Sequence, residues 1–184
     1  MADTAENKIV GRDNLKIMAP TKQLMEVSMK LLFKQRLFSW LDSYDIYDED
    51  GNTIYTVKGQ VSLGHCLNIM DASGQYVGTV KEKVMTFFPK FELYMGEAYM
   101  GCVKKEFSLI RPSFTVDFKG WVVEGDFSEW NYIIGTQYGQ TVAAVSKQIL
   151  KMTDTYVIDV MNPEDAIFVV MLVLAIDAEK CSGN

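Results

Sequence analysis

The segment at residues 166–176 is apolar at every position and lies between Asp165 and Asp177. A helix without a polar face must be enclosed by protein or by lipid. Counted from Pro163 to Asp177, such a helix is about 22 Å long, which is short of the roughly 30 Å hydrocarbon core of a membrane. Asn162 as an N-cap followed by Pro163 is typical of a helix start in a globular protein. The segment therefore predicts a helix buried inside the protein, with a membrane span as the alternative.

Most of the remaining chain shows the alternation of apolar and polar residues that is typical of half-buried strands. Phe114, Val116 and Phe118 alternate with polar residues, and residues 91–95 and 155–160 repeat the pattern. Turn residues separate these stretches at short intervals, which indicates antiparallel pairing. A sheet that surrounds an apolar helix must close around it. We therefore expect a mainly β protein, a closed antiparallel barrel around a C-terminal helix.

A diffuse repeat of strand, glycine turn and strand suggests that hairpins are the building unit. Three copies, at residues 44–58, 67–81 and 91–104, end in Val-Lys, and residues 132–147 form a looser copy. The alternative is that hairpins resemble one another because strands and turns have few solutions. Residues 84–89 break the pattern and predict a short helical turn or a corner that ends at the proline.

Several short motifs carry a resemblance to a known family. They are residues 30–35 (KLLFKQ), 38–40 (FSW), 44–48 (YDIYD), 62–64 (SLG) and 87–93 (FFPKFEL), followed by the apolar helix. Over residues 29–177 the chain resembles the LURP-one-related family, which includes the bacterial YxjI-like proteins. The resemblance implies a tubby C-terminal-like fold, a closed barrel of about twelve strands with the helix threaded through it. It also implies kinship with tubby domains and phospholipid scramblases, for which phosphoinositide binding or lipid movement has been proposed.

Composition indicates one domain with short appendages. The 184 residues are 48% hydrophobic, which argues against disorder. We expect a flexible extension at residues 1–28, the barrel domain at 29–178 and a tail at 179–184. No signal peptide is evident, and the three cysteines, Cys66, Cys102 and Cys181, are odd in number with no metal-like spacing. These features favour a reducing cytoplasm.

Residues suited to catalysis are scarce. His65 is the single histidine, and its neighbour Cys66 would point to the opposite face of a strand, so no catalytic residues, cofactor or metal are expected. The acidic turn at residues 48–52 has oxygen ligands for calcium but lacks the calcium-loop pattern, and a hairpin turn is favoured. Acidic residues near the helix start lack the spacing of the scramblase acidic motif.

Basic residues offer the sharper binding hypothesis. Tubby-like domains bind phosphoinositides through a basic barrel face, and the candidates here are Lys81, Lys83, Lys90, Lys104, Lys105 and Arg111. Lys81 and Lys83 would share one strand face, whereas Lys104 and Lys105 cannot. The formal net charge of −6 opposes long-range attraction to nucleic acid or to an anionic bilayer.

Together these patterns favour a non-enzymatic cytoplasmic binding or scaffold domain with an unidentified protein partner. The alternative is a peripheral membrane protein that binds phosphoinositide or another anionic lipid through a basic barrel face. An enzyme and a transmembrane scramblase-like protein rank below these two. No nucleic acid partner and no transmembrane span are expected.

Overall fold

The computed structural model describes residues 28–34, 43–106, 113–127, 129–150 and 153–182. In chain order its elements are β1 (Met29–Lys34), β2 (Ser43–Tyr47), β3 (Thr53–Gly59), β4 (Cys66–Asp71), β5 (Tyr76–Glu82), β6 (Lys90–Met95), β7 (Ala98–Glu106), β8 (Ser113–Asp117), β9 (Trp121–Asp126), β10 (Asn131–Thr136), β11 (Thr141–Leu150), β12 (Thr153–Val160), a 3₁₀ turn η1 (Pro163–Asp165) and α1 (Ala166–Ser182). The expected extension at residues 1–28 lies almost wholly outside the described residues.

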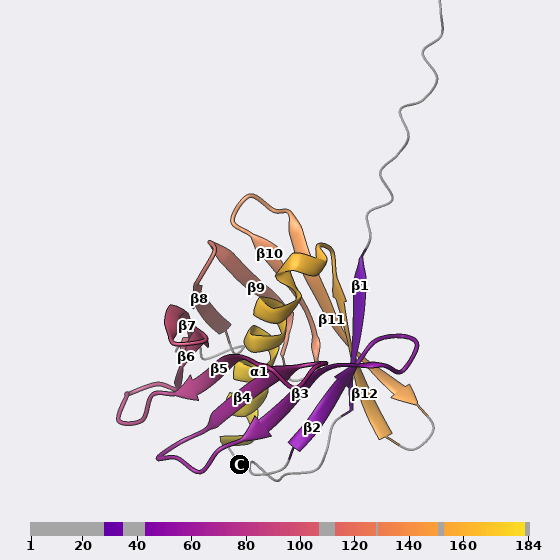
Figure 1. Ribbon diagram of the computed structural model, residues 1–184. Helices are drawn as coiled ribbons and strands as arrows, with labels where there is room; N and C mark the ends of the chain where they lie inside the picture. The colour runs from indigo at the N-terminus through magenta and orange to yellow at the C-terminus, as the bar shows by residue number, and fades with distance from the viewer. Residues whose placement is uncertain (1–27, 35–42, 107–112, 128, 151–152, 183–184) are drawn as a thin grey trace, which may run out of the picture.

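The twelve strands form one antiparallel sheet that curls into a nearly closed barrel (Figure 1). The strand order is β8-β7-β6-β5-β4-β3-β2-β1-β12-β11-β10-β9, so nearly every strand pairs with its neighbour in sequence. Its two edge strands, β8 and β9, follow each other in the chain, and a tight turn in which Trp121 N donates to Phe118 O at 3.0 Å joins them. The predicted mainly β barrel around a C-terminal helix is confirmed.

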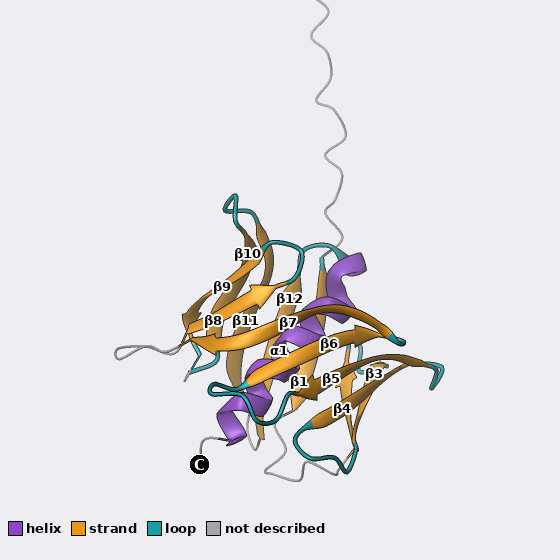
Figure 2. Ribbon diagram, turned by 90° about the vertical axis from the view of Figure 1, so that its left-hand side faces the viewer, coloured by secondary structure: helices purple, strands orange, loops and turns teal. Residues whose placement is uncertain are grey.

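Helix α1 runs through the barrel with strands on both of its sides (Figures 1 and 2). Between Val169 and Ile176 every side chain is at most 1% exposed. This confirms the buried helix predicted from the apolar segment, because the barrel wall encloses all its faces. In the described part of the chain, no helix combines the length and apolar character needed to cross a bilayer.

The two ends of α1 differ in how well the sequence predicted them. Asn162 Oδ1 accepts a hydrogen bond from Glu164 N at 3.1 Å, as expected of an N-cap, although the first turn is 3₁₀ rather than α-helical. At the other end the helix continues past Asp177 to Ser182, and the expected end was wrong. Polar side chains beyond Asp177 find partners on the barrel wall: Glu179 bonds Lys105, and Lys180 Nζ donates to Phe127 O at 2.6 Å.

The hairpins predicted from the repeat are also present. Strand pairs β2–β3, β4–β5, β6–β7 and β10–β11 correspond to its four copies. In the second of them, Gly78 of β5 lies so close to the helix that an added Cβ would be 2.1 Å from Met171 Cε and 2.6 Å from Tyr94 O. Only glycine therefore allows this wall to contact α1. Residues 84–89 form the predicted corner through bends, and the alternative of a helical turn was wrong.

Candidate anion-binding site

Four of the predicted basic residues gather on the outer surface of β5, β6 and β7. The inward positions of these strands are occupied by the buried Val80, Phe91 and Val103. Alternation then directs the neighbouring lysines outward. Lys81 of β5 lies opposite Glu92 of β6, and Lys90 of β6 lies opposite Lys104 of β7. We call the group Lys81, Lys83, Lys90 and Lys104 the lysine face.

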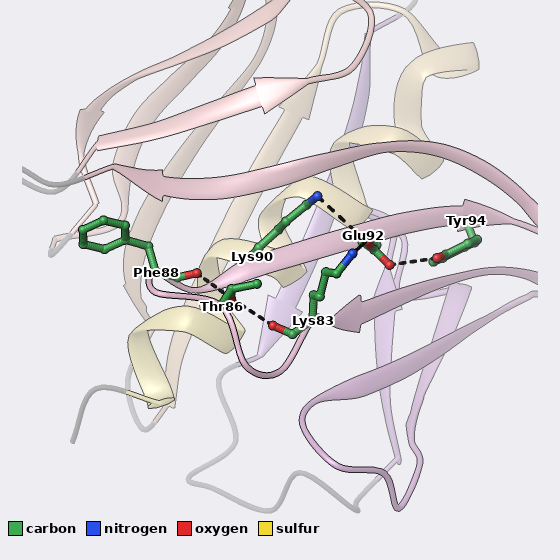
Figure 3. Close-up of polar contacts among 6 residues, drawn as sticks. All are labelled: Lys83, Thr86, Phe88, Lys90, Glu92 and Tyr94. Atoms are coloured by element: carbon green, nitrogen blue, oxygen red, sulfur yellow. Dashed lines mark hydrogen bonds and ion pairs between the residues drawn. The ribbon is translucent and has the colours of Figure 1, made fainter.

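A single carboxylate lies among these lysines. The Glu92 Oε1 atom is 3.3 Å from Lys83 Nζ and 3.9 Å from Lys90 Nζ, and its Oε2 atom accepts a hydrogen bond from the Tyr94 hydroxyl at 2.9 Å (Figure 3). Partial burial by itself would raise the pKa of Glu92. The hydrogen bonds from Tyr94 and Lys83 and the charges of Lys83 and Lys90 have the larger effect, so the pKa of Glu92 is lowered. Glu92 is therefore ionised at neutral pH and draws Lys83 and Lys90 together.

The charges of the other two lysines, Lys81 and Lys104, are not neutralised by an ion pair within the described residues. Lys81 and Lys104 are exposed, and neither forms an ion pair with any described residue. Glu92 lies opposite Lys81, and the other acidic neighbours among the described residues lie toward β8, where Glu106 Oε1 accepts from Thr115 Oγ1 at 2.5 Å and Asp117 lies opposite Cys102. The outer surface of β5, β6 and β7 thus has four ammonium groups against two carboxylates, Glu92 among the lysines and Glu106 on the side of β8, in a chain whose formal charge is −6.

Lys105 does not belong to this face. Lys105 points inward from β7 and bonds Glu179 of α1, so it links the wall to the helix. The rule that Lys104 and Lys105 cannot share a face is confirmed. We therefore leave Lys105 out of the lysine face, because the buried carboxylate of Glu179, which could not be foreseen from the sequence, binds its ammonium group. Arg111 lies outside the described residues.

The lone histidine has a structural contact. His65 Nδ1 lies 2.6 Å from Glu82 Oε2, and the same oxygen accepts from His65 N at 2.9 Å. The Cys66 thiol donates instead to Gln60 Oε1 at 3.6 Å, and burial raises its pKa despite the nearby charge of Lys81. A reactive cysteine needs a lowered pKa, so these neighbours do not form an activated nucleophile and base.

The acidic candidates have local partners as well. Asp48 accepts hydrogen bonds from both the backbone N and Nδ2 of Asn52, each at 2.8 Å, and the side-chain bond lowers its pKa. This confirms the hairpin turn at residues 48–52. At the helix start, Asp165 Oδ1 pairs with Lys119 Nζ at 2.5 Å. Within the described ranges, no three His, Cys, Asp or Glu residues are arranged to hold a metal ion.

Sequence reasoning missed the surroundings of the lysine face. The loop at residues 83–89 joins Lys83 to Lys90, and its apolar side chains point out of the protein rather than into the core. A pattern in the sequence could have signalled this, because an apolar run without strand or helix period, ended by Pro89 and bounded by lysines, fits no core element.

Comparison with known proteins agrees with this architecture. A family model described as LURP-one-related matches residues 29–177. The chain belongs to the LURP-one-related family. It is 28% identical over 151 residues to the uncharacterized protein YxjI of Bacillus subtilis (strain 168), covering 81% of this chain and 92% of YxjI. It is 27% identical over 164 residues to protein LURP-one-related 12 of Arabidopsis thaliana, covering 78% and 74% of the two chains.

A solved structure supports the fold itself. The crystal structure of an Arabidopsis thaliana protein matches with a TM-score of 0.58 at 18% identity, covering 83% of this chain and 91% of the other. The motifs from which the resemblance was inferred therefore identified the correct family.

Proposed function

We propose that this LURP-one-related protein is a non-enzymatic binding module that docks on membrane surfaces rich in anionic lipid headgroups through the lysine face. The observation that carries the proposal is the convergence of Lys81, Lys83, Lys90 and Lys104 on adjacent strands, with Glu92 as the one carboxylate among them. The hydrogen bond between His65 and Glu82 and the raised pKa of the Cys66 thiol support the proposal that the module is not an enzyme.

The acidity of the whole chain does not prevent such docking. The Debye length is about 10 Å at 0.1 M salt, so a headgroup at the surface senses the charges beside it far more than those across the barrel. Each lysine near an anionic leaflet contributes about 1 kcal/mol. Four lysines less the two carboxylates Glu92 and Glu106 would then give about 2 kcal/mol, so the binding would be reversible and sensitive to salt.

Vesicle cosedimentation tests the proposal. The protein is mixed with phosphatidylcholine vesicles that contain either phosphatidylserine or phosphoinositide, at about 20 mM and 200 mM salt, with pure phosphatidylcholine as the reference. We expect retention on the anionic vesicles at low salt and release at high salt. Lys81→Glu and Lys104→Glu should each lower retention without changing the melting temperature, because neither lysine forms an ion pair with a described residue.

Lys147→Glu is the matched control. Lys147 is exposed on β11, which is far from β5 and β6 in the strand order, and the substitution changes the net charge by the same amount. It should leave retention nearly unchanged. An equal loss with this variant would attribute binding to net charge and overturn the lysine face. Absence of retention on every anionic vesicle would overturn lipid docking and leave a protein partner as the ligand of the module.

A further inference from the structure

The loop between β5 and β6 has fully exposed apolar side chains at its tip. Met85 is 102% exposed and Phe87 99%, while Val84 and Phe88 are both more than 40% exposed. Isolated apolar residues on a surface need no explanation, but several within one short loop do. Lys83 and Lys90 stand at the two ends of this loop, so the apolar tip has a cation on each side of its base.

The neighbouring loop between β3 and β4 also has exposed apolar side chains. Leu63 is 88% exposed and Val61 82%. The two loops touch, since His65 O accepts from Glu82 N at 2.7 Å and a Cβ added to Gly64 would lie 2.7 Å from Val84 Cγ1. The hydrogen bonds between His65 and Glu82 tie the bases of the two loops together. We call Val61, Leu63, Met85 and Phe87 the apolar rim.

The backbone of the β5–β6 loop has a defined shape that keeps the tip outward. The Thr86 hydroxyl lies 3.0 Å from Lys83 O and 2.7 Å from Phe88 O and shares its one hydrogen between these two carbonyls, and the Phe88 ring points away from the lysines (Figure 3). Lys83 N donates to Lys90 O at 2.8 Å and closes the base of the loop. Met85 adopts a φ of 63°, a left-handed conformation that is unfavourable for a residue other than glycine. Outliers of this kind often mark functional segments.

We infer that the apolar rim inserts into the interfacial region of an anionic lipid bilayer while the lysine face contacts the headgroups. This inference rests on the proposed lipid docking and adds how deeply, and in which orientation, the protein binds the bilayer. An apolar tip with Lys83 and Lys90 at its base matches the order of a bilayer surface, where anionic headgroups lie outside the acyl chains. Stable attachment to a membrane generally requires two signals, and the rim supplies the second besides charge.

Tryptophan placed in the rim reports insertion directly. The Phe87→Trp variant is titrated with phosphatidylcholine–phosphatidylserine vesicles, with and without brominated acyl chains, and the wild-type spectrum is subtracted. We expect a blue shift on binding and quenching by the brominated lipid. Tyr138→Trp is the matched control, because Tyr138 is 84% exposed in the turn between β10 and β11. Its emission should stay unchanged.

Removing apolar area should weaken attachment. Phe87→Ser and Leu63→Ser are each expected to lower apparent vesicle affinity about tenfold, from the burial of a large apolar side chain. Ile133→Ser, on the outer face of β10 and 50% exposed in the wild type, should have no effect.

The outcomes separate insertion from the underlying function. Retention on anionic vesicles without a blue shift, and with normal affinity of Phe87→Ser, would overturn insertion while headgroup docking stands. Absence of retention would overturn both. Ultracentrifugation tests the competing occupant: a dimer that Phe87→Ser dissociates, with vesicle binding unchanged by the same variant, would assign the rim to a second copy of this chain.

Discussion

Two apolar parts of this chain lie in opposite environments, helix α1 inside the barrel and the apolar rim at one end of it. Val169 and Val170 of the helix are 0% exposed, whereas Met85 and Phe87 of the rim are almost completely exposed. The comparison shows that apolar sequence alone does not determine burial, because the position of the backbone decides which side chains reach the core.

The difference has a structural cause. The helix satisfies its own backbone hydrogen bonds, so it can lie in the barrel with apolar side chains in every direction. Once it is there, the barrel has no room for more, as the contact between Gly78 and Met171 illustrates. The rim loops start from strand ends that the sheet holds in place. Their side chains therefore do not reach the core, and no described residue covers Met85 or Phe87.

The largest effect should come from charging the helix. Val170→Asp places an unpaired carboxylate in the barrel axis, at a cost of several kcal/mol. Since domains of this size are stable by about 5–15 kcal/mol, we expect the variant not to fold, and thermal unfolding followed by circular dichroism would show no cooperative transition. Phe87→Asp also introduces a carboxylate, but at the exposed rim, and should keep the wild-type melting curve. Similar behaviour of the two variants would contradict the comparison.

A smaller effect on stability is expected at Asp177, where the apolar part of the helix ends. Burial raises the pKa of Asp177 to about 6, and Lys180 only partly opposes it. The folded state therefore holds the proton more tightly than the unfolded state, for which the value is 3.8. The resulting stabilisation is present below pH 4 and is lost as pH rises through about 6. At about 1.4 kcal/mol per unit, the ionised carboxylate costs about 1–3 kcal/mol at pH 8.

Asp177→Asn tests this linkage, because an amide does not ionise. The variant should be more stable than the wild type by about 1–3 kcal/mol at pH 8 and nearly equal to it at pH 4, as measured by urea unfolding. Asp117→Asn, at an exposed position on β8, should shift stability by under about 0.5 kcal/mol at either pH. If Asp177→Asn lowers stability at pH 8, a favourable contact of the charged side chain outweighs its burial.

The smallest effect on stability should occur at the rim. The double variant Leu63→Ser with Phe87→Ser removes two exposed side chains, so its free energy of unfolding should stay within about 0.5 kcal/mol of the wild type. Calorimetry of the protein in buffer measures this. A loss above about 1 kcal/mol would mean that the rim packs against the protein itself, and the two regions would then differ less than their exposures suggest.

Much of the fold could be predicted because periodicity is a local property. The helix from 163 onward, the hairpins and the glycine turns are each specified by a few neighbouring residues, and the family motifs supplied the number of strands. The end of α1 at Ser182 could not be predicted in this way, because it depends on Lys105 and Phe127, which are distant in sequence from the helix.

The candidate site was predicted only in part. Alternation placed Lys81 and Lys83 on one strand face and separated Lys104 from Lys105. The position of Lys90 opposite Lys104, and of Glu92 between two lysines, follows from the register of β5, β6 and β7. No local pattern encodes that register. The exposure of Leu63 and Phe87 could not be predicted from the sequence either, because the same side chains would be buried at an inward strand position.

The sequence by itself determined that the apolar segment at residues 166–176 forms a buried helix, that strands and turns make up most of the rest, and that Lys81 and Lys83 share one strand face. These properties follow from the order of neighbouring residues. Only the tertiary structure decided that the helix continues to Ser182, that Lys105 bonds Glu179 of the helix, and that four other lysines gather on one face beside the exposed loop at residues 83–89. Such contacts join residues far apart in the chain, and their energies depend on distances that only the closed sheet fixes.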